Sequence, residues 1–467
     1  MSESAVQPDS WLHIDALGPD RPYRPRARHV VQDVTGAPIA ALTQVPRLYA
    51  TRTLSRLRSA PASGAADGVA VHQERLARFA DLVEHGVVGG IGPEDHHRLV
   101  ARATGVPVSV VRAASTTIAD AARAAGRSVE AARPRYATWD RANLDPVRGG
   151  VLWRRKGRLL GVHAAGNHPA VHSLWFDALV LGYRVVVRPS RRDPFTAHRV
   201  VLALRESGVP AEDVVLLPGD HDIGDEVVRG SDLAMVFGGD EVVRRYGQGG
   251  TPVLPQGPGR VKVLVQGPWE SHLDSVVESV CGLAGVSCLN TTAVLADTDP
   301  AGLAAALAER LASFSPLAPE DDAAVLPCRP LAEARALAEL LRTHSAGTTA
   351  VGTTSGIVHD LGDGSAALRP SVRLLPCVSS VQRDVELPFP CVWVAPWNRS
   401  DGVAPLRSSL VVAVAATEQS LVDDLLAEPT IHNLYGLDRP TWWLGPGLPH
   451  DGYLSEFLMR CSTVAGL

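Results

Sequence analysis

Hydrophobic positions in the middle of the chain alternate between short continuous runs and helical spacing. The continuous runs are typical of buried strands and lie within residues 159–165, 184–188, 213–219 and 233–239. Apolar residues recur at helical spacing over residues 169–181, 195–207 and 222–230, and another helix is expected from Asp240. This alternation predicts βαβ units and a parallel sheet that holds ligands at the carboxyl ends of its strands.

The N-terminal region differs from the middle of the chain in composition and in hydrophobic pattern. Residues 1–60 are rich in proline and arginine with short extended pieces, and residues 59–68 are typical of a flexible link. Helices are expected at residues 72–85 and 107–125, with Ser115 or the threonine after it as a candidate cap. We interpret this region as accessory to the domains that follow.

A second α/β pattern occupies residues 260–425, with helices expected at residues 301–313 and 331–343. The end of the chain, residues 432–467, is too short for a domain and is expected to pack back on the others. The predicted organisation is an accessory region contributing to the cofactor domain (1–145), a dinucleotide-binding domain (146–258), a catalytic domain (259–430) and a C-terminal segment (431–467).

Composition narrows the class of protein. A chain of 467 residues exceeds one usual hydrophobic core, so subdomains around a shared cleft are expected. The net charge is −5 and arginines are scattered among acids, which argues against a nucleic-acid partner. The six cysteines show no paired spacing for zinc or disulfides. Without an export signal or a membrane-length apolar run, we expect a cytoplasmic protein with no membrane contact and no metal.

Cys288 is the most informative single residue. Apolar positions at helical spacing over residues 273–284 place Cys281 in the core, two glycines then interrupt the pattern, and residues 291–295 are typical of a buried strand. Cys288 therefore lies in a connection, where a thiol can be partly exposed and activated by backbone dipoles or a neighbouring donor. The alternative for a lone cysteine is a buried structural thiol.

An ordered set of motifs surrounds this cysteine. The set comprises Ala165-Gly-Asn167-His-Pro169, Arg188-Pro189-Ser190, Gly208-Val-Pro210, Pro218-Gly219, Phe237-Gly238-Gly239-Asp240, Gly285-Val-Ser-Cys288, Val385-Glu386-Leu-Pro-Phe389 and Asn433. Over residues 150–450 this order resembles the aldehyde dehydrogenase superfamily. Leu-Pro-Phe-Pro-Cys391-Val-Trp393 and Pro449-His-Asp-Gly-Tyr453 are most similar to its acyl reductase branch, which includes the fatty-acid reductase of bacterial bioluminescence and reductases of phenazine and aminohydroxybenzoate pathways.

The resemblance implies an α/β fold with a Rossmann-type cofactor domain, a second α/β catalytic domain and a homo-oligomer. Its catalytic residues would be Cys288, Asn167 and His168. A thiolate that attacks an acyl group makes an oxyanion, which needs preorganised donors. The Asn167 amide and the Cys288 N–H match the family's oxyanion hole, while His168 or His172 is a candidate for proton transfer. A turn role for Asn167 and structural roles for the histidines are the alternatives.

Cofactor contacts are also carried over from the resemblance. Arg188 stands where the family has a lysine that touches the adenosine ribose, and Ser190 follows it. Arg191 stands where NAD-preferring members often carry a glutamate, so its charge favours the 2′-phosphate of NADP(H) over NAD. A solvated surface cluster is the alternative for these arginines.

The remaining cofactor positions are three glycines and two residues of a later motif. Turns at Gly219, Gly238 and Gly239 let backbone N–H groups approach a pyrophosphate. Glu386 and Phe389 match the family's contacts to the nicotinamide ribose and ring. A strand-end charge for Glu386 and core packing for Phe389 are the alternatives.

One position departs from the aldehyde-oxidising members. Gln256 stands where they carry the glutamate that activates water to hydrolyse the acyl-enzyme. An amide cannot take a proton from water at neutral pH, so an acyl group on Cys288 should resist hydrolysis. The sequence hypothesis is therefore NADPH-dependent reduction of an activated carboxylic acid, as adenylate or thioester, to an aldehyde through a Cys288 thioester. An adenylating or acyl-transferring protein would supply this acyl substrate.

Several alternatives stay open from the sequence. They are an aldehyde dehydrogenase that forms an acid or thioester, a catalytically silent scaffold for an adenylating enzyme, and a cysteine hydrolase using Cys288 and His168. The tryptophans at positions 153, 175, 393, 397, 442 and 443 are enough to line an aromatic pocket. They favour an aryl acid of secondary metabolism, such as antibiotic biosynthesis.

Overall fold

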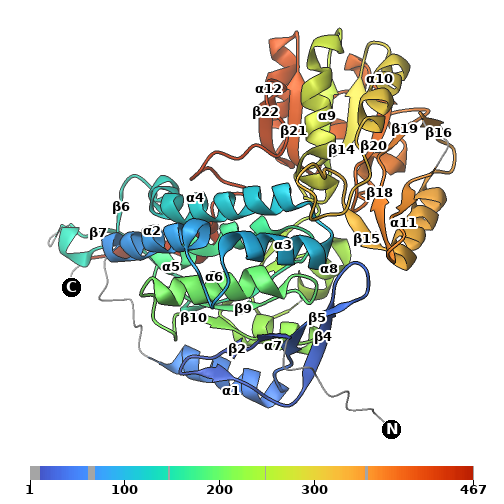
Figure 1. The fold of residues 1–467 in the computed structure, drawn as a ribbon. Coiled ribbons are helices and arrows are strands. Elements are labelled where there is room, and N and C mark those ends of the chain that lie inside the picture. Colours follow the sequence, from blue (N-terminus) through green and yellow to red (C-terminus); the bar gives the residue numbers. More distant parts are fainter. Residues whose placement is uncertain (1–10, 61–68, 146–147, 248, 353–355, 466–467) are drawn as a thin grey trace.

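The computed structural model describes residues 11–60, 69–145, 148–247, 249–352 and 356–465. These residues form two lobes, each built on a seven-stranded sheet (Figure 1). Residues 61–68 of the expected flexible link lie outside the described residues. The alternation of strands and helices is present in both lobes, so the predicted α/β class with a Rossmann-like parallel sheet is confirmed.

The first sheet has the strand order β12-β11-β8-β9-β10-β2-β3. Its parallel strands are β8 (Leu159–His163), β9 (Arg184–Arg188), β10 (Val214–Leu216), β11 (Leu233–Phe237) and β12 (Val253–Gln256). Two N-terminal strands, β2 (Ala16–Leu17) and β3 (Pro22–Tyr23), extend one edge in antiparallel pairing. The N-terminal region therefore contributes directly to this sheet.

Helices follow the strands of this sheet as the apolar spacing predicts. They are a 3₁₀ turn (Pro169–Trp175) that continues into α5 (Phe176–Val180), then α6 (Pro194–Glu206), α7 (His221–Gly230) and α8 (Asp240–Gly247). The side chains of Asp193 and Asp220 accept hydrogen bonds from the backbone N–H groups of Thr196 and Ile223. These aspartates satisfy N–H groups that lack a helical partner, which explains where α6 and α7 begin.

Four N-terminal helices pack around this sheet: α1 (Arg47–Ser59), α2 (Val69–His85), α3 (Pro93–Thr104) and α4 (Val108–Ala132). Helices α2 and α4 share a core with α5, α6 and one face of the sheet, and α1 and α7 cover the other face. The candidate cap Ser115 was wrong, because the helix already begins at Val108 and Ser115 is buried inside it against His97. Apolar residues before Ser115 extend the helical pattern.

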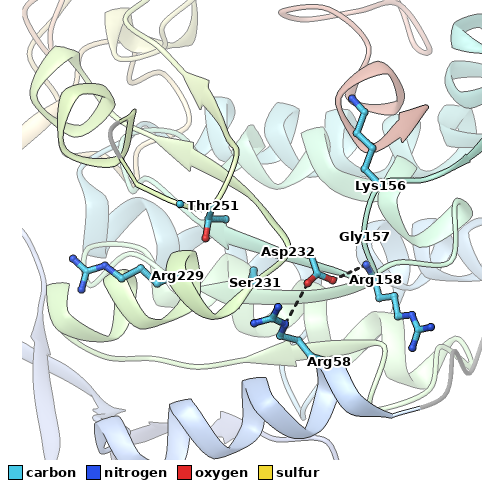
Figure 2. Close-up of a pocket in the computed structure, with 9 residues that line it drawn as sticks. Arg58, Lys156, Gly157, Arg158, Arg229, Ser231, Asp232 and Thr251 are labelled. Atoms are coloured by element: carbon cyan, nitrogen blue, oxygen red, sulfur yellow. Dashed lines mark hydrogen bonds and ion pairs between the residues drawn. The ribbon is translucent and has the colours of Figure 1, made fainter. Parts of the chain in front are cut away.

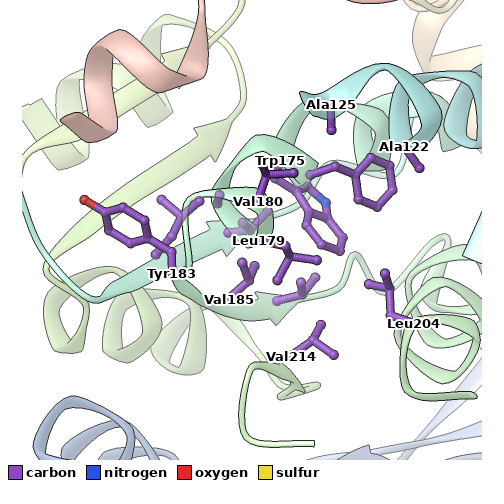
Figure 3. Packing of buried hydrophobic residues seen from close by; sticks show 14 of the residues in the cluster. Ala122, Ala125, Trp175, Leu179, Val180, Tyr183, Val185, Leu204 and Val214 are labelled. Atoms are coloured by element: carbon purple, nitrogen blue, oxygen red, sulfur yellow. The ribbon is translucent and has the colours of Figure 1, made fainter. Parts of the chain in front are cut away.

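The largest core cluster lies between this sheet and α2, α4, α5 and α6. Figure 3 shows Trp175 and Leu179 of the helical layer against Val185, Leu204 and Val214. All five side chains are 3% exposed or less. Trp175 is therefore a core residue, and its burial anchors the segment that follows β8.

The second sheet has the strand order β16-β19-β20-β14-β13-β21-β22 and is parallel except at β16. Its strands are β13 (Val261–Val265), β14 (Thr291–Ala296), β16 (Thr349–Val351), β19 (Ser371–Leu374), β20 (Cys391–Pro396), β21 (Ser409–Ala415) and β22 (Ile431–Gly436). Helices α9 (Leu273–Cys281), α10 (Pro300–Ala312), α11 (Leu331–His344) and α12 (Gln419–Ala427) belong to the same lobe (Figure 1).

Three small sheets complete the fold. The first contains β1 (Leu12–Ile14), β5 (Pro38–Thr43) and β4 (Arg28–Gln32). The second contains β15 (Cys328–Pro330), β18 (Ser365–Leu368) and β17 (Val358–Asp360). The third contains β23 (Met459–Val464), β7 (Gly150–Arg155) and β6 (Ala137–Thr138). The C-terminal strand β23 pairs with β7 of the first lobe, after helix α13 (Leu454–Leu458). The chain thus returns from the second lobe to the first. Among the described residues, no helix combines the length and apolarity needed to cross a membrane.

Candidate active site

A cavity of about 490 Å³ lies between the two lobes and contains Cys288. Three parts of the chain line it. The first lobe contributes Asn167, His168, Gly238, Gly239 and Gln256; the second contributes Cys288 and Glu386; the C-terminal segment contributes Trp442, Trp443, Leu444 and His450. The cavity meets the ends of the parallel strands β8, β11 and β12, which is where α/β sheets bind ligands.

The loop that presents Cys288 is shaped by a sharp change of backbone direction. Helix α9 ends at Cys281, and Leu283, Ala284 and Gly285 all have left-handed φ angles. A side chain at Gly285 would come within 2.5 Å of the Pro390 backbone, so the loop packs closely on the next segment. The predicted helix, interruption and strand around this loop are all present, and Cys281 is buried as expected.

Asn290 holds the same loop in place. Its Oδ1 accepts a hydrogen bond from Ser287 N at 2.9 Å, and its Nδ2 donates to Ser279 O at 3.3 Å. A further hydrogen bond joins Asn290 Nδ2 to Gly282 O. One side chain therefore ties the nucleophile loop to the end of α9, although the sequence pattern assigned it no role.

The surroundings of Cys288 favour the protonated thiol over the thiolate. Burial raises the pKa of Cys288 to about 12, and the negative charge of Glu386 adds to the effect. The sequence predicted a thiol activated by backbone dipoles or a donor. Hydrogen bonds from Ser287 and from the Cys288 backbone N–H act in the predicted direction, but burial and Glu386 outweigh them.

His450 is the functional candidate that the sequence analysis missed. Its Nε2 lies 3.8 Å from Cys288 Sγ, and Asn433 Nδ2 fixes its loop by donating to His450 O at 2.7 Å. Burial lowers the pKa of His450 to about 4, so the ring is neutral and can accept a proton. Its Nδ1 is buried without a hydrogen-bond partner among the described residues. The motif from Pro449 to Tyr453 was the only signal for this position.

Asn167, the candidate oxyanion donor, is on the first-lobe wall of the cavity. It lines the cavity with Cys288, and its Nδ2 donates to Val286 O at 2.9 Å. This bond uses one of the two amide N–H groups and fixes the side chain against the nucleophile loop. No described residue accepts a hydrogen bond from the second N–H, which can therefore donate to a ligand oxygen.

The two histidines after Asn167 differ in position. His168 lines the cavity, and its Nδ1 accepts a hydrogen bond from Ala170 N at the start of the 3₁₀ turn. Burial lowers the pKa of His168 to about 4. His172 is buried in the core, where Trp175 Nε1 donates to its Nδ1 at 3.4 Å. The structure therefore assigns His172 to packing and keeps His168 beside the cavity.

Gln256 ends strand β12 and faces the cavity. Its side chain is 8% exposed, and its Oε1 has no hydrogen-bond partner among the described residues. The amide that replaces the family's glutamate is therefore in the same cavity as Cys288. An unpaired buried amide oxygen is an acceptor for a ligand donor but cannot act as a base.

Glu386 and Phe389 come from one motif but lie in different surroundings. Glu386 lines the cavity and its Oε1 accepts a hydrogen bond from Arg260 N at 2.7 Å. Phe389 is 1% exposed and packs in the core of the second lobe. The predicted contact of Phe389 with a nicotinamide ring is not supported, because its side chain is enclosed by apolar neighbours.

The turns at the ends of β8 and β9 lie against each other. A Cβ added to Gly166 would be 2.2 Å from Ser190 Oγ, so only glycine allows this approach. Beyond β11, a Cβ on Gly239 would meet no atom within 4 Å, which leaves open space over the backbone. Both features fit a dinucleotide that approaches main-chain N–H groups.

Arg188 supports a turn instead of presenting its charge. The side chain is 5% exposed, and Nη2 donates to Gly219 O at 2.9 Å in the turn after β10. Burial lowers the pKa of Arg188 to about 10. The predicted ribose contact is corrected on this ground. Arg191 is exposed, whereas Arg192 pairs with Glu333 at 2.9 Å, so of these two arginines Arg191 is the better candidate for a 2′-phosphate.

A larger cavity of about 790 Å³ lies elsewhere, at the amino ends of β8 and β11. Figure 2 shows Asp232 between Arg58 and the backbone of Arg158, with contacts of 3.2 Å and 2.7 Å. The Arg229 and Lys156 side chains point away from this pair. The cavity has no cysteine or histidine in its lining and lies at the wrong end of the strands for the predicted chemistry.

Comparison with known proteins identifies the family. The aldehyde dehydrogenase family profile matches residues 94–372, more than half of the chain. The chain therefore belongs to the aldehyde dehydrogenase family, whose members are NAD(P)-dependent oxidoreductases that act on aldehydes.

Three individual similarities are informative. The chain is 41% identical over 68 residues to the bifunctional protein PutA of Rhizobium meliloti, and 29% identical over 140 residues to a probable acylating methylmalonate-semialdehyde/malonate-semialdehyde dehydrogenase of Caenorhabditis elegans. These matches cover 15% and 28% of this chain but only 6% and 27% of the relatives. An indole-3-acetaldehyde dehydrogenase solved with NAD+ superposes with a TM-score of 0.82 at 17% identity, covering 96% of each chain, which shows the shared fold.

Proposed function

We propose that this protein is an NAD(P)-dependent aldehyde dehydrogenase that forms a thioester on Cys288 and passes the acyl group to a thiol acceptor. The observation that carries the proposal is one cavity lined by Cys288, Asn167 and Gln256. The first two residues support thioester formation, and the third removes the usual route to hydrolysis. The family match supports aldehyde oxidation more directly than the reductase hypothesis.

Thioester formation begins with addition of sulfur to the aldehyde. His450 accepts the Cys288 proton as Sγ bonds to the carbonyl carbon, and the free N–H of Asn167 with the Cys288 N–H stabilises the oxyanion. Return of the proton to this oxygen gives a thiohemiacetal. His450 takes the hydroxyl proton of the thiohemiacetal again as the carbonyl forms, and a bound nicotinamide cofactor would accept the hydride, which leaves the Cys288 acyl thioester.

The fate of the thioester depends on the groups around it. Gln256 cannot deprotonate water, and Glu386 is held by the Arg260 backbone N–H. A thiol acceptor that attacks the carbonyl carbon releases Cys288 and leaves as the new thioester. The same steps in reverse would reduce an acyl thioester to an aldehyde.

Acyl reduction is the second candidate, and Gln256 is also the observation that favours it. In this direction an adenylating or acyl-transferring protein would load Cys288, as the resemblance to the acyl reductase branch implies. The exposed Arg191 supports NADP(H) as the preferred cofactor in either direction. Both the branch and the cofactor preference are proposals.

The test compares product formation with and without a thiol. The purified chain is mixed with an aldehyde and NADP+ or NAD+, and reduced cofactor is followed in the presence and absence of coenzyme A or N-acetylcysteamine. We expect one turnover per site without thiol and continuous turnover with it. Continuous acid formation without thiol would contradict the proposal.

Gln256→Glu tests whether the amide at this position is what prevents hydrolysis of the thioester. Restoring a carboxylate should convert the single turnover into continuous hydrolysis, because general-base catalysis contributes about 10²-fold or more. Glu386→Gln is the control for the other carboxylate in the cavity. If Glu386→Gln abolishes a hydrolysis that the parent enzyme already performs, Glu386 is the water-activating base and the role given to Gln256 is wrong.

A further inference from the structure

A second cavity of about 210 Å³ adjoins the Cys288 cavity. The two cavities share the lining residues Thr117, Ser173, Leu174, Gln256, Leu444 and His450. The outer cavity is formed by α4, the segment around α5 and residues 444–454 of the C-terminal segment. Its described lining contains none of the turns at Gly219, Gly238 or Gly239, so the proposed pyrophosphate contacts lie outside it.

The charges of this outer cavity are all of one sign. Asp120, Asp177 and Asp451 line it, whereas its described lining contains no lysine or arginine. Asp451 pairs with His432, and Asp120 shares Arg123 with two other acids, Asp81 and Glu84. Part of the negative charge of these two residues is therefore balanced.

The negative charge of Asp177 is not balanced by an ion pair with any described residue. Its Oδ2 accepts hydrogen bonds from the hydroxyl groups of Ser128 at 2.7 Å and Ser455 at 3.3 Å, and no described residue forms an ion pair with it. Burial raises the pKa of Asp177 to about 6, so the carboxylate is still mostly ionised at neutral pH. Asp177 therefore places in the wall of the outer cavity a carboxyl group that no described cation neutralises.

The inner cavity also lacks lysine and arginine among its described lining residues. Glu386 is its only acidic or basic residue other than histidine among those described, and its walls include Val171, Leu174, Leu283, Trp442 and Trp443. Both histidines of its lining are neutral, because burial lowers the pKa of His168 and of His450 to about 4. The described lining of the two cavities therefore contains no cation that would bind a carboxylate on the substrate.

We propose that Asp177, with Asp120, selects substrates by charge: the enzyme acts on neutral or positively charged apolar aldehydes and disfavours aldehydes that carry a carboxylate. This inference rests on the proposed function. It separates the chain from the relative named for methylmalonate semialdehyde and malonate semialdehyde, which are both anionic compounds. Repulsion between like charges in a partly dehydrated channel is the physical reason.

Substrates of equal chain length test the inference. The purified chain, with cofactor and acceptor thiol, is assayed for kcat/KM with butanal, succinate semialdehyde and 4-(trimethylammonio)butanal. We expect succinate semialdehyde to be about tenfold or more poorer than butanal, and the cation to equal or exceed butanal. High ionic strength should reduce the difference, because salt screens charges that remain in contact with water.

Two variants assign the effect to the cavity. Asp177→Asn keeps an acceptor for Ser128, and Asp120→Asn changes a partly exposed residue of α4; each should raise the ratio of succinate semialdehyde to butanal by about threefold or more. Asp274→Asn is the control, because it removes the same charge from an exposed position outside both cavities. Its ratio should equal that of the parent enzyme.

The outcomes separate this inference from the proposed function. If succinate semialdehyde matches or exceeds butanal, or if the aspartate variants leave the ratio unchanged, charge selection by these carboxylates is wrong and the proposed function stands. If none of the three aldehydes reduces the cofactor and Cys288 acquires no acyl group, the proposed function itself fails.

Discussion

The two walls of the Cys288 cavity differ in the regularity of the chain that forms them. The wall formed by the first lobe carries Asn167, Gly239 and Gln256 at the ends of strands β8, β11 and β12. The opposite wall carries Trp442 and His450 on the irregular C-terminal segment. The comparison teaches that the residues proposed for the chemistry lie at strand ends, whereas the histidine beside the thiol comes from a segment with little regular structure.

Replacement of Cys288 tests the proposed nucleophile, which lies in the cavity between the two walls. Cys288→Ala should reduce kcat by roughly 10³-fold or more, because no other described thiol lines the cavity. Cys377→Ala is the control, because that thiol is exposed and its pKa is lowered by hydrogen bonds from Ser379 and Ser380. Steady-state kinetics with aldehyde and thiol checks both variants. Activity that follows Cys377 would reject Cys288 as the nucleophile.

On the strand-end wall, Asn167→Ala should lower kcat about 10²-fold, since removing one oxyanion donor costs that order of rate. His168→Gln should have a smaller effect, because His168 caps the following turn and has no contact with Cys288 among its described hydrogen bonds. The comparison is made on kcat, with the melting temperature as the check on folding. An equal loss in both variants would mean that the turn, and not the Asn167 amide, matters.

On the C-terminal wall, His450→Gln should lower kcat/KM about 10²-fold, the usual contribution of a general base. His432→Gln is the matched control, because His432 pairs with Asp451 near the same loop but does not line either cavity. If His450→Gln changes KM alone, the ring positions the substrate and takes no part in proton transfer.

The protonation state of the thiol gives a pH prediction. The pKa of Cys288 is raised to about 12 by burial and by Glu386, so its thiolate fraction at neutral pH is small. Alkylation of Cys288 by iodoacetamide should therefore increase about tenfold per pH unit from about pH 6 to about pH 9, without a plateau. Peptide mass spectrometry measures the rate at each cysteine. A plateau near neutral pH would show a thiolate already paired with a cation, and the described lining of the cavity contains no lysine or arginine.

The smallest expected effect concerns the cofactor. Arg191→Glu should shift the ratio of kcat/KM for NADP+ over NAD+ by about tenfold toward NAD+, because the exposed charge is reversed. Arg192→Glu is the control, since Arg192 is engaged by Glu333. An equal shift in both variants would indicate that charge acts on the cofactor at long range, without a specific contact at Arg191.

Much of the strand-end wall is predictable from the sequence because it depends on local periodicity. The helix before Cys288, the strand after it and the burial of Cys281 follow from apolar spacing, and so do β8 to β11 and α6 and α7. The domain boundaries stay predictions. The branch within the family also stays a prediction, since it depends on few residues.

The parts that the sequence could not show depend on contacts between distant segments. His450 lies 162 positions from Cys288 and has no periodic neighbours, so only folding brings the two side chains together. The burial of Arg188 against Gly219 and of Phe389 in the second core likewise depends on tertiary packing. The pKa of Cys288 is a property of the assembled cavity, and a sequence motif does not contain it.

The most direct test of the central claim is peptide mass spectrometry of the full-length chain after mixing with butanal and NADP+ in the absence of thiol. The account predicts a butanoyl group on the peptide that contains Cys288, stable until coenzyme A or N-acetylcysteamine is added and then lost. Continuous accumulation of butanoate, with Cys288 unmodified throughout, would contradict it.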